Sequence, residues 1–95
     1  MSLDTIETEF GEKAIRRGGL MFFSPKDAIR VIQRCRILHR RILGIDAFIL
    51  TDTITQPVMA ESVEYDNNTV DTWERAMEFL NERLDSEFCF EVVYE

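Results

Sequence analysis

Two residues have the chemistry that acid–base catalysis needs. His39 is the only histidine in the chain, and Asp46 interrupts an otherwise apolar segment. Histidine and carboxylate side chains are the usual proton donors and acceptors in enzymes. Catalysis by His39 would also require a nucleophile or carboxylate partner, and no motif indicates one. His39 follows the apolar face of a predicted helix, where a half-buried structural imidazole is common.

Asp46 allows three interpretations. A carboxylate among apolar strand residues points to solvent, pairs with an arginine, or belongs to a site. A small enzyme that uses Asp46 and His39 remains one hypothesis, but a chain of 95 residues rarely encloses a substrate cleft. We therefore predict that the protein is not an enzyme.

Metal and cofactor sites are not indicated. The two cysteines, Cys35 and Cys89, lie inside apolar patterns, and a zinc site would lack ligands beside the single histidine. The sequence contains no P-loop, GxGxxG, HExxH or GxSxG motif. We expect no cofactor, no metal, and two reduced thiols in a cytoplasmic protein.

Charge is divided unevenly along the chain. Residues 1–41 hold nine basic and five acidic side chains, a balance of +4, and residues 42–95 hold two basic and thirteen acidic ones, a balance of −11. An acidic half repels nucleic acid and attracts cationic proteins. The basic cluster of Arg34, Arg36, Arg40 and Arg41 has no interleaved exposed aromatics, so it does not resemble a single-strand binding surface. We predict a basic protein partner and no nucleic acid.

Helix signals are clear in two segments. Ser24-Pro25 starts the first helix, near 25–41, whose apolar side chains share one face and for which Gly44 is a plausible stop. The second helix, near 69–84, follows a turn at 66–69 and carries an apolar stripe that includes Trp73 as a core anchor. That stripe consists of Val70, Trp73, Met77, Leu80 and Leu84.

Strand signals flank both helices. Segment 45–51 is apolar on both faces, and 87–94 alternates apolar with other residues up to the C-terminus. Weaker strands are predicted at 20–23 and 58–65, with 52–57 as a turn. The predicted fold class is α+β, with two amphipathic helices on one face of a small, mainly antiparallel sheet.

The length fits one domain. We predict that residues 1–95 form a single domain, in which the role of segment 1–19 is uncertain. No apolar run approaches the ~20 residues of a membrane helix, and no signal peptide is evident. These features lead us to expect no membrane association.

Acids repeat along the second helix. Glu74, Glu78 and Glu82 lie four residues apart, a spacing at which like charges destabilise a helix slightly. Three explanations are open: the face is solvated, the basic stripe of the first helix offsets the repulsion, or an external basic surface does so. Because the turn at 65–68 leads into this helix, its acids and the first helical turns can form one surface. We predict that the partner is bound by Tyr65, Asp66, Asp71, Glu74 and Glu78.

Several short motifs resemble a known family. Leu43-Gly44-Ile45-Asp46-Ala47-Phe48, then Tyr65-Asp66-Asn67, then the terminal strand resemble immunity protein 40, from bacterial polymorphic-toxin systems. Ile45 replaces a glycine of the family pattern, and Asn68-Thr69 replaces an aromatic pair. The resemblance covers about residues 25–95 and implies a cytoplasmic protein that binds and neutralises a toxin domain.

Two hypotheses about binding follow. The first is an immunity-type inhibitor that covers a cationic toxin surface. The alternative is a homodimeric structural or regulatory module that pairs through an exposed strand edge, such as that of the C-terminal strand.

Overall fold

The computed structural model describes residues 5–66 and 68–95. Asn67 of the predicted turn and residues 1–4 of the uncertain N-terminal segment lie outside this range. Along the described chain the helices are α1 (Thr5–Phe10), α2 (Pro25–Ile37), the 3-10 helix η1 (Met59–Glu61) and α3 (Thr72–Asn81). The strands are β1 (Ile15–Arg17), β2 (Leu20–Phe22), β3 (Ile42–Leu50), β4 (Thr55–Pro57), β5 (Val63–Glu64) and β6 (Cys89–Tyr94).

Helix α2 starts at the predicted residue but ends earlier than predicted. The Ser24 hydroxyl accepts a hydrogen bond from the Asp27 N–H at 3.3 Å, and Pro25 occupies the first turn. The helix ends at Ile37 rather than near residue 41, because His39 takes a left-handed conformation with φ +56°. The Arg40 N–H then reaches back to the Cys35 carbonyl at 2.8 Å, the pattern of a Schellman motif.

Gly44 therefore does not end a helix. It lies inside β3, where a Cβ would come within 2.8 Å of the Val63 carbonyl oxygen. Its role is to allow the close approach of β5, and the prediction of a helix stop at this residue was wrong.

The second helix is shorter than predicted. Asp71, with φ +54°, caps α3 by accepting a hydrogen bond from the Glu74 N–H at 3.2 Å, so the helix begins at Thr72 rather than at residue 69. Val70 consequently falls outside the helix and is 78 % exposed, and Leu84 lies beyond the other end and is 49 % exposed. The predicted apolar stripe is buried only in its middle.

The sheet is antiparallel and centred on β3. Strand β6 pairs with one edge of β3, and β4 and β5 pair with the other edge. The predicted strand at 58–65 is interrupted by η1, and part of the predicted turn at 52–57 forms β4. The predicted short strand at 20–23 is present as β2, paired with β1 in a separate hairpin.

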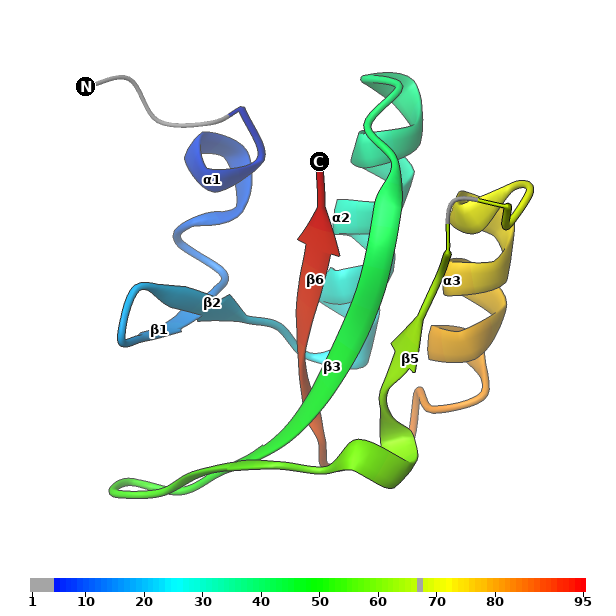
Figure 1. The fold of residues 1–95 in the computed structure, drawn as a ribbon. Coiled ribbons are helices and arrows are strands. Elements are labelled where there is room, and N and C mark those ends of the chain that lie inside the picture. The colour runs from blue at the N-terminus through cyan, green and yellow to red at the C-terminus, as the bar shows by residue number, and fades with distance from the viewer. Residues whose placement is uncertain (1–4, 67) are drawn as a thin grey trace.

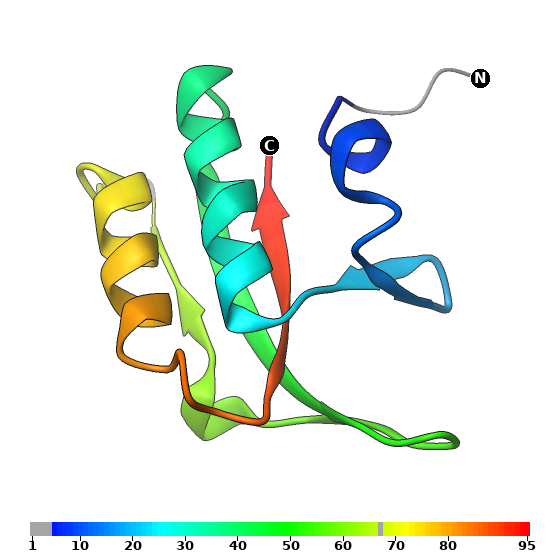
Figure 2. The same cartoon turned by 180° about the vertical axis from the view of Figure 1, so that it is seen from behind.

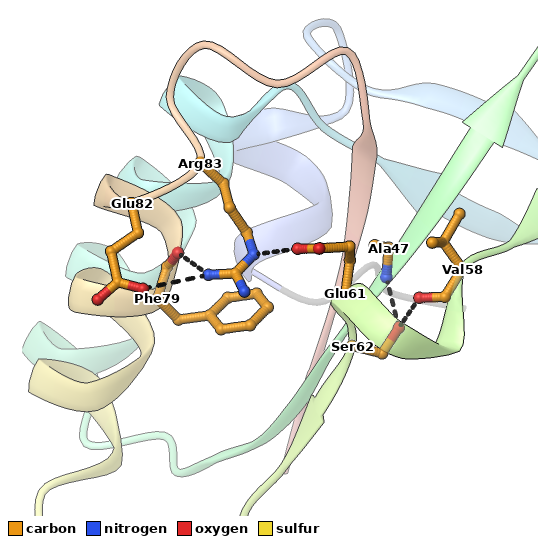
Figure 3. Close-up of polar contacts among 7 residues, drawn as sticks. All are labelled: Ala47, Val58, Glu61, Ser62, Phe79, Glu82 and Arg83. Carbon is orange, nitrogen blue, oxygen red and sulfur yellow. Dashed lines mark hydrogen bonds and ion pairs between the residues drawn. The ribbon is translucent and has the colours of Figure 1, made fainter.

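Ser62 holds the break between β4 and β5 in place. Its hydroxyl accepts a hydrogen bond from the Ala47 N–H at 2.9 Å and donates one to the Val58 carbonyl at 3.0 Å (Figure 3). A side chain thus replaces a ladder carbonyl where η1 interrupts the strand.

Helices α2 and α3 lie on the same face of the sheet (Figure 1 and Figure 2). The buried core between the layers includes Val31 and Ile32 of α2, Leu80 of α3 and Phe90 of β6. The predicted α+β class, with two helices on one face of a mainly antiparallel sheet, is confirmed. Within the described chain, no helix has the length and apolar character needed to cross a membrane.

Candidate protein-binding surface

The structure brings most of the predicted contact residues onto one side of α3. Asp71, Glu74 and Glu78 line a shallow, open hollow of about 440 Å³, together with Val70 and Arg75. Three carboxylates and a 78 % exposed valine, Val70, therefore share one surface. We call these five residues the α3 surface.

Tyr65 borders this surface. It lines a neighbouring hollow of about 250 Å³, and Arg75 and Glu78 belong to both hollows. The Tyr65 ring is half-buried and packs against the core. Burial raises the pKa of its phenol, an effect that the nearby Arg75 and Arg83 guanidiniums oppose.

Asp66 lines neither hollow. One of its carboxylate oxygens accepts hydrogen bonds from the Asn68 N–H at 2.9 Å and the Thr69 hydroxyl at 3.0 Å. Its backbone carbonyl accepts a bond from the Arg41 guanidinium. The carboxylate of Asp66 closes the turn before α3, so its first role is structural.

The three repeated acids of this helix differ in their partners. Glu74 lies 3.9 Å from an Arg36 guanidinium nitrogen, but both side chains are more than half exposed. A surface pair of that kind contributes little. A single base of α2, Arg36, thus offsets one acid weakly. Among the described residues, Glu78 forms no ion pair.

The nearby base Arg83 is already engaged. Its guanidinium lies 2.7 Å from a Glu61 carboxylate oxygen and 3.5 Å from one of Glu82, and it donates to the Phe79 carbonyl at 2.9 Å (Figure 3). It also stacks 3.7 Å from the centre of the Phe79 ring. These contacts tie α3 to η1, so the base that shares both hollows with Glu78 is Arg75.

His39 and Asp46, the two residues with acid–base chemistry, are not in contact as a pair. No hydrogen bond or ion pair between them is found in the described structure. His39 is exposed rather than half-buried, and its backbone ends α2. Within the same range, no group of three metal-ligating side chains could hold an ion.

Asp46 belongs to an acidic group that the sequence did not reveal. It lies directly opposite Glu91 of β6. Because the next pair, Ala47 and Phe90, points into the core under the helices, Asp46 and Glu91 point to the other face of the sheet. Burial raises the pKa of Asp46, and the charge of Glu64 raises it further. Burial and then the charge of Asp46 raise the pKa of Glu91. The alternation of residues 88–94 predicts that Glu91 and Phe90 point to different faces of the sheet. The strand pairing that places Glu91 beside Asp46 cannot be derived from one segment.

The cysteines are free thiols, as predicted. Cys35 is buried in the core. Cys89 is half-buried, and burial raises the pKa of its thiol against the opposing charge of Arg17.

No protein-family model matches this chain, and no curated protein sequence matches it.

Proposed function

We propose that this chain is an immunity-type binding protein that neutralises a bacterial toxin domain by covering a basic surface of that domain. The observation that carries the proposal is the α3 surface, where Asp71, Glu74 and Glu78 face solvent around an exposed Val70. Charged groups at such a surface speed the encounter with a basic partner, while apolar and aromatic groups supply affinity.

The charge of the whole molecule supports the same proposal. At a net charge of −7, the chain would be attracted to a cationic protein over several ångströms before contact. Nuclease toxins carry basic clefts that bind phosphate, and an acidic protein seated on such a cleft would block it. Reduced thiols at Cys35 and Cys89 suit a reducing compartment, so we place this activity in the cytoplasm.

The test starts with capture of the partner. Tagged chain is incubated with an extract of its source cells at low salt, and retained proteins are identified by mass spectrometry. The proposal expects a basic protein that stops growth when expressed alone and is tolerated when this chain is co-expressed. Retention of proteins that are all harmless when expressed alone would contradict the immunity role.

Matched variants connect the activity to the α3 surface. Glu74→Lys/Glu78→Lys changes the net charge from −7 to −3, since each reversal adds two charges. Glu12→Lys/Asp52→Lys makes the same change at exposed positions outside this surface. The first variant should lose protection and the second should keep it. Equal loss in both would show that overall charge, rather than this surface, is responsible.

A further inference from the structure

Strand β6 is paired along one edge only in part. Phe23 exchanges two backbone hydrogen bonds with Phe90, at 2.8 and 2.7 Å, on the side of β6 away from β3. Continuing this antiparallel register would place Met21 opposite Val92. Met21 instead pairs with Arg16, because β2 turns away from β6 to form the β1–β2 hairpin. The position beside Val92 is left without a strand from the described chain.

The backbone of Val92 points toward that vacant position. Alternate residues of an antiparallel strand direct their N–H and C=O groups to opposite sides. Phe90 directs these groups away from β3, so Val92, two residues later, does the same. An outward N–H and C=O pair at a strand edge is a template for one more strand.

A cleft of about 320 Å³ lies along this edge. One wall is Glu91, Val92 and Tyr94 of β6, and the other is formed by α1 and β2. Ile6, Phe23 and Val31 lie beneath its surface and are buried or nearly so. The apolar side chains that the cleft exposes are the half-buried Met21 and the exposed Leu20 of β2, and its β6 side offers backbone groups to the edge of an incoming strand.

Two acids and one base line the cleft, so the charge of its lining is −1. Glu7 and Glu91 line it and form no ion pair within the described residues. Arg40 also lines it, but its Nε donates to the Glu95 carbonyl at 3.0 Å and its guanidinium stacks on the Tyr94 ring at 4.7 Å. A basic side chain beside Glu91 would relieve the repulsion between Glu91 and Asp46.

We propose that the outer edge of β6 accepts a short, extended, basic segment of a partner protein as an additional antiparallel strand. A residue opposite Val92 turns its side chain to the same face of the sheet as Val92, and basic residues at alternate positions lie near Glu91 and Glu95 on the other face. A second copy that pairs β6 with β6 fits less well, because it would bring Glu7 and Glu91 against the same acids of the other copy. The proposal does not depend on the α3 surface.

The probe is a synthetic peptide, acetyl-Lys-Val-Thr-Val-Lys-amide, titrated into the ¹⁵N-labelled full chain. Antiparallel pairing with Glu95 to Glu91 places its second valine opposite Val92. We expect amide shift changes concentrated at Val92, Met21 and Glu7, and slower hydrogen exchange of the Val92 N–H. The absence of binding, or shifts concentrated on α3, would overturn the proposal.

Two control peptides separate backbone pairing from charge. N-methylation of the second valine removes the N–H that would donate a hydrogen bond to the Val92 carbonyl. This change should weaken binding about fivefold, the loss expected for one hydrogen bond. Replacing both lysines with glutamates should weaken it at least as much. Equal affinity for all three peptides would exclude strand addition.

Variants of the chain locate the site and distinguish it from the α3 surface. Glu7→Lys and Glu91→Lys should each weaken the lysine peptide about fivefold or more, while Glu74→Lys/Glu78→Lys should bind it unchanged. Because Glu7 and Glu91 are tested separately, one variant still tests the site if the other fails to fold. If sedimentation shows a dimer in which the Val92 N–H is already protected, a second copy occupies the edge and the peptide proposal is wrong.

Discussion

We predict that Trp73 stabilises the position of α3 and thereby of the acids that it carries. The indole is half-buried against the core, and its Nε1–H donates to the Arg40 carbonyl at 2.8 Å. This bond joins α3 to the segment between α2 and β3. Removing the indole would therefore loosen the helix that carries the α3 surface without altering any of its charges.

Two substitutions separate the hydrogen bond from the packing. Trp73→Phe leaves the Arg40 carbonyl without its donor and should cost about 1–2 kcal/mol. Trp73→Ala also removes the ring, and we expect about 3 kcal/mol, the lower end for buried tryptophan because the side chain is only half-buried. At about 0.2 kcal/mol per kelvin of unfolding entropy for a domain of this length, these losses lower Tm by roughly 5–10 °C and 15 °C.

Circular dichroism melts and urea titrations at pH 7 would measure both effects. Val70→Ala is the matched control, because Val70 lies close in sequence but is 78 % exposed, and it should change stability by less than about 0.5 kcal/mol. If Trp73→Ala melts within about 2 °C of the parent chain, the indole is not an anchor and the reasoning fails.

Three further predictions concern the sheet. Burial raises the pKa of Asp46 and of Glu91. Their contribution to stability is therefore full below the pKa of the unfolded chain and is lost as pH rises through the pKa of the folded chain. Asp46→Asn/Glu91→Gln should consequently raise Tm at pH 7. Melts from pH 3 to pH 8 should show that gain vanish below about pH 4, and a gain independent of pH would refute the titration argument. Ser62→Ala leaves the Ala47 N–H without its acceptor and should cost about 1–3 kcal/mol by urea titration, and an unchanged midpoint would show that the bond is not needed. Since burial raises the pKa of Cys89, its thiol should react with a disulfide reagent at pH 8 more slowly than an exposed cysteine peptide, and an equal rate would contradict the packing.

Local signals predicted the start of α2 better than its end. Ser24-Pro25 fixes the start of α2 through one side-chain acceptor and one constrained φ, both readable from residue type. The helix ends at Ile37 because His39, a non-glycine residue, takes a positive φ that local backbone hydrogen bonds close, whereas a search for glycine chose Gly44 instead. Likewise, nothing in segment 58–65 shows that Ser62 would support a break in the strand.

The acids of α3 could be predicted as a group, whereas those of the sheet could not. Glu74 and Glu78 are one helical turn apart, so their spacing alone puts them on one surface. Asp46 and Glu91 lie 45 residues apart in the chain and meet only through the register of β3 and β6. The edge of β6 beside Val92 is open because β2 pairs with β1 there. Local sequence patterns do not show which strands pair with each other.

The rate of association with the captured partner tests the central claim most directly. We would measure it at low and at high salt for the parent chain, for Glu74→Lys/Glu78→Lys, and for the control Glu12→Lys/Asp52→Lys. The account predicts that the parent rate falls as salt rises. It also predicts that the α3 variant associates about tenfold or more slowly at low salt with little salt dependence, and that the control stays close to the parent. A rate that ignores both salt and these reversals would contradict the account and direct attention to Arg30 and Arg34 on α2.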